Sequence, residues 1–240
     1  MDRVIYLTFD MDWASDEVLV WFYGFMRDLA VPYEINVTHD TKVLQKFRED
    51  DLVELGIHPN FNWLLNGGGN GGVDYKEVLS KVKSIVPEAI TMRSHSLTDN
   101  SLIEAELRNV GIRNNLNLLF PPFDGMVSKA YKNCYNINVI PFLYEDDVYI
   151  LSDKKMSIDY YLSDRFDAPR IFNMHPIHVF LNTDKMDTYV NAKPYLKEFE
   201  ELKERTNNSE YGTRDFLVDL ISRAKELEYD FLRIKDGNWK

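Results

Sequence analysis

The fold is decided first by residues 4–30, VIYLTFDMDWASDEVLVWFYGFMRDLA. Val4 to Phe9 form a mostly apolar run that predicts a buried strand, and Ser15 then offers an N-cap for a long apolar helix. Asp10 and Asp12 lie between the two, one residue apart. If the strand continues, its alternation points both carboxylates to the same face, where like charges repel. A solvated surface pair would tolerate this repulsion, whereas a cation, a shared proton or a substrate would give the pair a function.

Strand-like and helix-like segments alternate along most of the 240 residues, a pattern that predicts parallel strands covered by helices. No change of composition and no Pro/Ser-rich linker interrupts the chain. We therefore predict one α/β domain over residues 1–240, of a size that suits a barrel or distorted barrel. Further strands are expected at residues 32–38, 52–57, 88–93, 112–117, 139–144, 170–175 and 230–234, and further helices at 41–50, 75–85, 100–111, 194–204 and 213–227.

Two segments depart from this rhythm. Residues 121–170 fit a regular strand–helix alternation least well and are expected to contain long loops. Residues 66–72, NGGGNGG, lack both the ending of a P-loop and the glycine spacing of a dinucleotide-binding turn. We interpret this glycine-rich segment as a flexible connector or lid.

Composition and charge exclude several classes of partner. The net charge of −11 argues against nucleic acid or an anionic membrane surface as the main partner. No stretch approaches the ~20 apolar residues of a membrane-spanning helix, and the first strand begins without a charged or apolar leader. Cys134 is the single cysteine, which excludes an intramolecular disulfide and a thiolate metal cluster. We therefore expect a cytoplasmic protein.

The histidines are placed at or just after the ends of predicted strands. In parallel α/β folds these ends converge on one face, where active sites form. Any one histidine alone would more simply be a buried structural residue, but the set, together with Asp10 and Asp12, favours a shared site. Carboxylate and imidazole together are typical ligands of zinc or another first-row divalent ion. The five histidines are His39, His58, His95, His175 and His178.

Five motifs resemble those of the polysaccharide deacetylases, the NodB-homology group of carbohydrate esterases. Within that group the chain is similar to the WbmS-type branch, which is linked to surface-polysaccharide biosynthesis. The resemblance implies a distorted (β/α) barrel of about seven parallel strands. It also implies a metal-dependent hydrolase that removes an acyl group, most simply N-acetyl, from a sugar. The motifs are LTFDMDWAS (7–15), ELGIHPNFN (54–62), MRSHSL (92–97), YEDDVY (144–149) and FNMHPIHVFLN (172–182).

The resemblance assigns metal-binding roles residue by residue. The family motif TFDDG maps its general base onto Asp10 and its metal ligand onto Asp12, although Met11 is inserted between them. The family's second motif, H-x-x-x-H, supplies His58, but Asn62 occupies the position of the second histidine. Either Asn62 ligates through its amide oxygen, or another histidine replaces it, or the metal is lost. His95 is the best substitute.

The remaining motifs imply roles in catalysis and support. Arg93 matches an arginine that orients the catalytic aspartate, and His175 matches a histidine general acid at a strand end. Asp146 or Asp147 is expected to hold Arg93. His39 and His178 have no counterpart in the common family pattern, and they are expected to line the site or to hydrogen-bond to its ligands. Trp13 and Trp63 adjoin the motifs and are candidates for stacking on a sugar ring.

The substrate expected from this resemblance is an acylated sugar, and the lack of a leader favours a nucleotide- or lipid-linked intermediate. Two other functions stay open on the sequence. Asn62 allows a scaffold that binds carbohydrate but has lost its metal. The D-x-D of Asp10 and Asp12 also fits, loosely, a magnesium-dependent phosphatase of the haloacid-dehalogenase type, with EDD (145–147) as its later acidic group.

Overall fold

The computed structural model describes residues 3–12, 14–65, 72–152 and 157–239. Trp13 and residues 66–71 of the glycine-rich segment lie outside the described residues. The strands are β1 (Val4–Asp10), β2 (Tyr33–Val37), β3 (Val53–Ile57), β4 (Thr91–Met92), β5 (Asn114–Asn115), β6 (Tyr131–Lys132), β7 (Asn138–Val139), β8 (Tyr144–Glu145), β9 (Arg170–Met174) and β10 (Asp230–Phe231). The helices are α1 (Asp16–Leu29), α2 (Leu44–Arg48), α3 (Asn62–Leu65), α4 (Tyr75–Ile85), α5 (Ser101–Asn109), α6 (Asp146–Leu151), α7 (Ile158–Tyr161), α8 (Pro176–Leu181), α9 (Met186–Ala192), α10 (Phe199–Lys203) and α11 (Thr213–Glu226).

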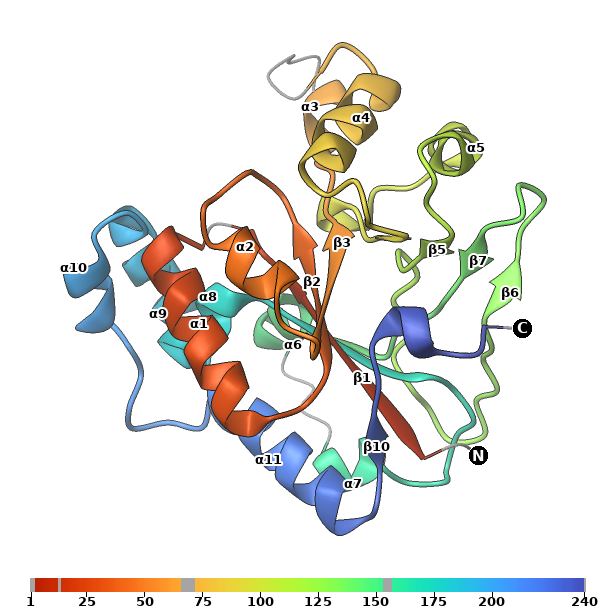
Figure 1. The fold of residues 1–240 in the computed structure, drawn as a ribbon. Coiled ribbons are helices and arrows are strands. Elements are labelled where there is room, and N and C mark those ends of the chain that lie inside the picture. Colours follow the sequence, from red (N-terminus) through yellow and green to blue (C-terminus); the bar gives the residue numbers. More distant parts are fainter. Residues whose placement is uncertain (1–2, 13, 66–71, 153–156, 240) are drawn as a thin grey trace.

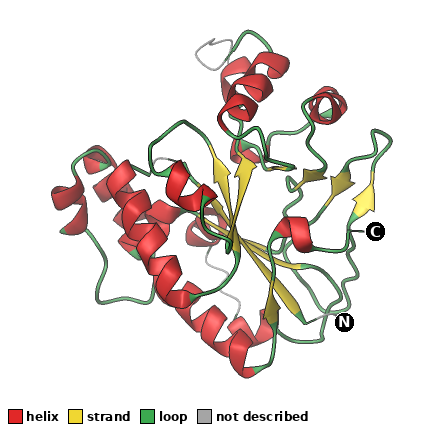
Figure 2. Cartoon of the chain, viewed as in Figure 1, coloured by secondary structure: helices red, strands yellow, loops and turns green. Residues whose placement is uncertain are grey.

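The described strands form one curled, ten-stranded sheet (Figure 1). Its order is β6-β7-β5-β4-β3-β2-β1-β9-β8, and β10 pairs with the start of β1, where β2 does not reach. All pairs are parallel except β6 with β7. Figure 2 shows the helices packed around this sheet, with α1, α8, α9 and α11 together on one side. The predicted α/β fold with a barrel-like parallel sheet is confirmed.

The short segment 140–143 connects β7, next to one end of the sheet order, with β8, at the other end. Ile140 N donates to Asn115 O at 2.9 Å on the β5 side, whereas Leu143 N donates to Ile171 O at 3.0 Å in β9. The prediction of one strand over residues 139–144 is therefore wrong. The chain exchanges its partner strand within that segment, where Pro141 has no N–H to continue a ladder. Because the same few residues bond to β5 near one end of the sheet order and to β9 near the other, the sheet curls back on itself.

Most predicted elements are present, with shorter ends. The Ser15 hydroxyl accepts a hydrogen bond from Val18 N at 3.4 Å and caps α1 as expected. Gly111 has φ +80°, the left-handed conformation of a residue just past a helix C-terminus. The strands β4 and β5 contain only two residues each, fewer than predicted. None of the helices within the described ranges combines the length and the apolar character that crossing a bilayer requires.

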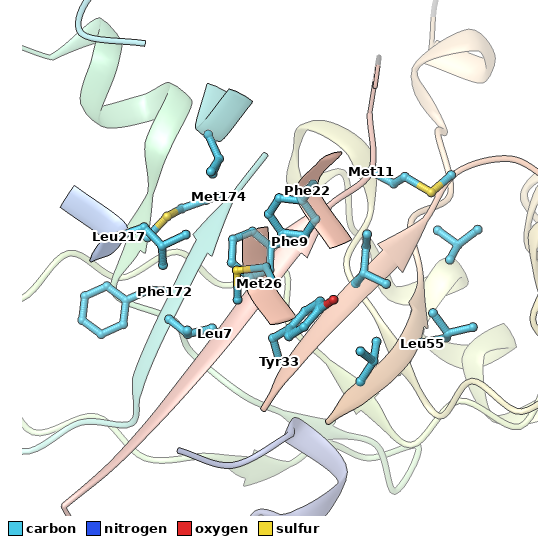
Figure 3. Close-up of a cluster of buried hydrophobic side chains, with 14 of the residues drawn as sticks. Leu7, Phe9, Met11, Phe22, Met26, Tyr33, Leu55, Phe172, Met174 and Leu217 are labelled. Atoms are coloured by element: carbon cyan, nitrogen blue, oxygen red, sulfur yellow. The ribbon is translucent and has the colours of Figure 1, made fainter. Parts of the chain in front are cut away.

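The two faces of β1 have different surroundings, and this difference positions the site. Leu7, Phe9 and Met11 point outward into the apolar core, where they meet Phe22 and Met26 of α1 (Figure 3). The intervening side chains point into the curl of the sheet. Met11 N still donates to the β2 backbone, at 3.0 Å from Asn36 O, so the extended conformation continues past the strand. Alternation therefore brings the carboxylates on either side of Met11 to the inner face.

Candidate active site

Polar side chains from four strand ends meet at the C-terminal edge of the sheet. Asp10 ends β1, and His58 follows β3. Arg93 follows β4, and His175 follows β9. All four are buried, as is Asp12, whereas His95 is partly exposed on a short 3₁₀ turn (His95–Leu97). Parallel strands place their C-terminal ends at one edge, so residues far apart in sequence become neighbours here.

Asp12 lies between two imidazoles. Its Oδ2 atom is 3.0 Å from His58 Nε2, and the same oxygen contacts His95 Nδ1. One ligand atom from each of the three residues lies within 4.8 Å of the others. One carboxylate oxygen and two imidazole nitrogens are a donor set that suits zinc and leaves a coordination position open. These three residues could therefore hold a divalent ion.

Asp10 is completely buried below this group and is held by three side-chain donors. Its Oδ1 atom accepts from Asn36 Nδ2 at 3.0 Å and from Arg93 Nη1 at 3.2 Å, and its Oδ2 atom accepts from Asn173 Nδ2 at 2.7 Å. His58 Nδ1 lies 3.5 Å from Asp10 Oδ1. Asp10 is thus fixed in one orientation beside a candidate metal ligand.

Charge keeps both carboxylates ionised. Burial acts to raise the pKa of Asp10, but the nearby charges of His58, Arg93 and His175 lower it below its usual value. Burial also opposes ionisation of Asp12, and there His58 and His95 outweigh it and hold the pKa well below the usual range. The like-charge repulsion expected between the two carboxylates is therefore offset by cationic neighbours.

His175 forms a second pair, with Asp146. Its Nδ1 is 2.7 Å from Asp146 Oδ1, and its backbone N donates to Asp146 Oδ2 at 2.8 Å. Burial alone would lower the pKa of His175. Asp146 and Asp147 outweigh this effect and raise the pKa well above its ordinary value. The imidazolium is therefore favoured, with Nδ1–H directed at Asp146 and Nε2–H left as a donor.

The His175 pair belongs to a second group that could be mistaken for a metal site, Asp146 with His175 and His178. Asp146 accepts three N–H hydrogen bonds, two from His175 and one from Asp147 N at 2.9 Å, so both of its oxygens are already engaged. His178 Nδ1 is 3.0 Å from Thr183 Oγ1, and burial lowers the pKa of His178 to about 4. We interpret this group as a hydrogen-bonded support for His175.

An open groove of about 500 Å³ leads from Asp12 and His58 to the surface. His39 and Trp63 line it, and Trp63 is 43% exposed. His39 therefore lies near the site without joining the metal-binding group. Asn62 takes a different place, because its amide is bonded to Ser96 Oγ and Thr98 Oγ1, at 3.0 Å each. Ser96 lies within the turn that carries His95, and Thr98 follows this turn directly.

A family model described as WbmS-like polysaccharide deacetylase matches residues 7–193. The chain belongs to the WbmS-like polysaccharide deacetylases. WbmS of Bordetella bronchiseptica, a proposed polysaccharide deacetylase involved in O-antigen biosynthesis, has a crystal structure that superposes with a TM-score of 0.81. It is 32% identical in sequence, and the match covers 92% of this chain and 90% of that one. No functionally curated protein matches the chain.

Membership of the WbmS-like deacetylases removes the phosphatase alternative. The family model covers residues 7–193, which include Asp10, Asp12 and the EDD segment on which that alternative rested. The expectation that Asp146 or Asp147 holds Arg93 is also wrong. Arg93 instead donates to Asp10, to Thr8 Oγ1 at 3.0 Å and to Asn173 Oδ1 at 2.6 Å. Asp146 is turned toward His175.

Sequence reasoning missed the residues that hold Asp10 from the neighbouring strands. Asn36 in β2 and Asn173 in β9 are both fully buried. A signal for the first was present, because Glu34 and Asn36 alternate with apolar residues in a short strand and so share one face. Polar side chains on the inner face of a curled sheet point toward the enclosed site, here toward Asp10.

Proposed function

We propose that this WbmS-like deacetylase is a metal-dependent hydrolase that removes an N-acetyl group from a sugar. The observation that supports it most is the convergence of Asp12, His58 and His95 beside the His175–Asp146 pair. One set offers ligands for a divalent ion, for which zinc is our first choice. The other set offers a proton donor. Hydrolysis of an amide needs both functions, because the carbonyl must be polarised and the leaving amine must be protonated.

Each residue has a separate task. A divalent cation held by Asp12, His58 and His95 would polarise the acyl carbonyl and lower the pKa of the attacking water. Asp10 accepts the proton of that water, because Oδ2 bonds to one described donor and keeps a lone pair. Arg93 and Asn173 hold Asp10 in place. His175 donates from Nε2 to the leaving nitrogen.

The groove beside Asp12 and His58 is the proposed binding site for the sugar. Trp63 presents an exposed ring beside His39, and such a ring suits the apolar face of a sugar. The O-antigen role given for WbmS supports a sugar of a surface polysaccharide, or its nucleotide- or lipid-linked precursor, as the substrate here. Trp13 lies outside the described residues, so its stacking role stays a prediction.

Acetate release tests the proposal. Purified protein is incubated with a panel of N-acetylated mono- and oligosaccharides, before and after treatment with a chelator. We expect release that stops in the metal-free protein and returns with zinc. An unchanged rate after verified metal removal would contradict metal dependence. Sugar binding without acetate release, by a protein that takes up no metal, would instead favour the metal-free scaffold alternative.

A further inference from the structure

A buried carboxyl group that the proposed chemistry does not use lies on the inner face of β2. Glu34 is 0% exposed, and no well-formed hydrogen bond reaches either of its side-chain oxygens among the described residues, although the Thr91 hydroxyl is close enough to act on it. Two residues further along the same face, Asn36 is also 0% exposed, and its Oδ1 likewise lacks a partner within the described part of the chain. Buried acceptors without donors are costly and call for an explanation.

Gly56 shows that these two acceptors lie close together. A Cβ atom on Gly56 would lie 2.1 Å from Asn36 Oδ1 and 3.2 Å from Glu34 Oε1. Both oxygens therefore face the same small space above β3. A side chain at position 56 would displace the Asn36 amide, which explains why this position in the ELGIH segment is glycine.

The orientation of the Asn36 amide is set from its other end. Its Nδ2 donates to the ionised Asp10, so its Oδ1 is turned away from Asp10, into the space beside Gly56 that Glu34 Oε1 also faces. An amide has one donating and one accepting end. If Glu34 were ionised, Asn36 would meet an acceptor at both ends, and either orientation would leave one acceptor–acceptor contact. A single proton on Glu34 removes this conflict.

We propose that Glu34 is protonated and donates to Asn36 Oδ1, so that Glu34 is a positioning residue that fixes, through Asn36, the orientation of Asp10. The inference rests on the proposed function in that Asp10 is taken as the general base. It extends the catalytic arrangement by one hydrogen bond into the interior of the sheet. Glu34 itself does not touch the substrate.

The charges that face Glu34 agree with a neutral acid. Burial is the main cause that raises its pKa well above the usual value, and Glu54 on β3 and Asp10 on β1 add to it. Arg93, after β4, lowers the pKa of Glu34 through its charge, and the Thr91 hydroxyl lowers it through a hydrogen bond. Arg93 Nη1 is engaged by Asp10, Thr8 and Asn173, whereas its buried Nη2 has no hydrogen-bond partner among the described residues and so makes no hydrogen bond to Glu34.

Three variants test the proposal. Glu34→Gln replaces the acid proton by an amide N–H that can donate to Asn36, whereas Glu34→Met has a similar size and no donor. Glu54→Gln is the matched control, because Glu54 is the cross-strand partner of Glu34 and does not contact Asn36 in any described hydrogen bond. Hydrolysis of para-nitrophenyl acetate is measured for each, together with thermal unfolding.

We expect Glu34→Gln and Glu54→Gln to stay within about threefold of the parent, and kcat of Glu34→Met to fall roughly ten- to a hundredfold with little change in KM. The difference infrared spectrum between the parent and Glu34→Gln should contain the carbonyl band of a protonated carboxylic acid near neutral pH. This readout needs no activity, so it tests Glu34 even if the proposed function fails or Glu34→Met does not fold. Absence of the band, or equal losses in Glu34→Gln and Glu34→Met, overturns the proposal.

Discussion

Asp10 and Asp12 lie on the same side of β1, yet their partners differ. Asp10 is enclosed by the donors of Asn36, Arg93 and Asn173, whereas Asp12 faces the groove between two imidazoles. Met11 separates them because it packs outward into the core with 0% exposure. The inserted residue thus raises one carboxylate into the groove and leaves the other buried below it. We therefore expect substitutions of the two aspartates to differ in kind.

Asp12→Asn replaces a charged ligand by a neutral amide and should strongly weaken zinc binding. Asp10→Asn leaves the three candidate ligands in place and removes the proton acceptor, so zinc should stay while turnover falls by ~10²–10⁴-fold. Zinc stoichiometry and acetate release, measured side by side, check both expectations. If Asp10→Asn loses zinc as completely as Asp12→Asn, Asp10 acts on the metal site, and its role as the base is wrong.

His95 and Asn62 should also differ. We expect His95→Ala to lose zinc, because it removes a candidate ligand. Asn62→Ala should weaken zinc binding by only about tenfold, because Asn62 supports the turn of His95 through Ser96 and Thr98. Titration with a competing chelator measures both affinities. A larger loss in Asn62→Ala than in His95→Ala would restore Asn62 as the ligand.

The candidate metal ligands Asp12, His58 and His95 could be named from the sequence because they lie in motifs that resemble those of the family and follow predicted strands. The family resemblance also implied that Arg93 orients Asp10, and Arg93 Nη1 does donate to Asp10 Oδ1. The further expectation that Asp146 or Asp147 holds Arg93 failed, because which second carboxylate reaches an arginine depends on how far the sheet curls. The roles assigned to these side chains stay predictions until the variants are measured.

At the scale of elements, α8 and α11 are joined by one asparagine. Asn182 ends α8 with φ 51°, and its Oδ1 accepts from Arg214 N at 3.0 Å and Asp215 N at 3.3 Å. The first turn of α11 is therefore capped by a side chain from another helix. Gly212 passes so close that a Cβ atom there would lie 2.1 Å from Asn182 O. This contact fixes the segment that also carries His178.

Asn182→Ala should reduce the free energy of unfolding by about 2 kcal/mol, because it removes a cap and places alanine in the left-handed region. Urea unfolding measures the change. Asn208→Ala is the control, since Asn208 is exposed and its side chain bonds only to the nearby Thr206 O within the described structure. A loss in the control as large as that in Asn182→Ala would contradict the capping role.

Long elements were predictable because their periodicity is local. The helix α1 and the strands β1 to β3 contain enough alternating or amphipathic positions to define themselves. The two-residue strands β4 and β5 do not, because backbone pairing with neighbours defines them. The exchange of partners between β7 and β8 could not be read from VIPFLY, which is apolar throughout whichever strand it contacts.

At the scale of the whole molecule, buried acids should make stability depend on pH. Glu54 is 4% exposed, and burial, opposed by a hydrogen bond from Lys235 N, raises its pKa to about 7 from an ordinary 4.5. Between these two values the native state holds more protons than the unfolded state. The free energy of unfolding therefore falls as pH rises from 4.5 to about 7, and above about pH 7 it falls no further through Glu54.

Glu54→Gln should remove this cost. We expect the variant to be little different from the parent at pH ~4.5 and more stable at pH ~8, by on the order of 3 kcal/mol at most. Chemical unfolding at a series of pH values measures the difference. A gain that is the same at every pH would show that Glu54 does not titrate in this range.

The long-range pairing of β9 also bears on how the chain folds. Strand β9 inserts between β1 and β8, so residues 170–174 must find residues 5–9 across most of the chain. Such distant pairing carries a large loop-closure entropy and predicts slow folding with a late barrier. Asn173 arrives with β9, and before then Asp10 and Arg93 lack this shared partner. Strand closure and completion of the hydrogen bonds around Asp10 are therefore one kinetic event, and in a chain arrested before it both Asp10 and Arg93 lack their bond to Asn173.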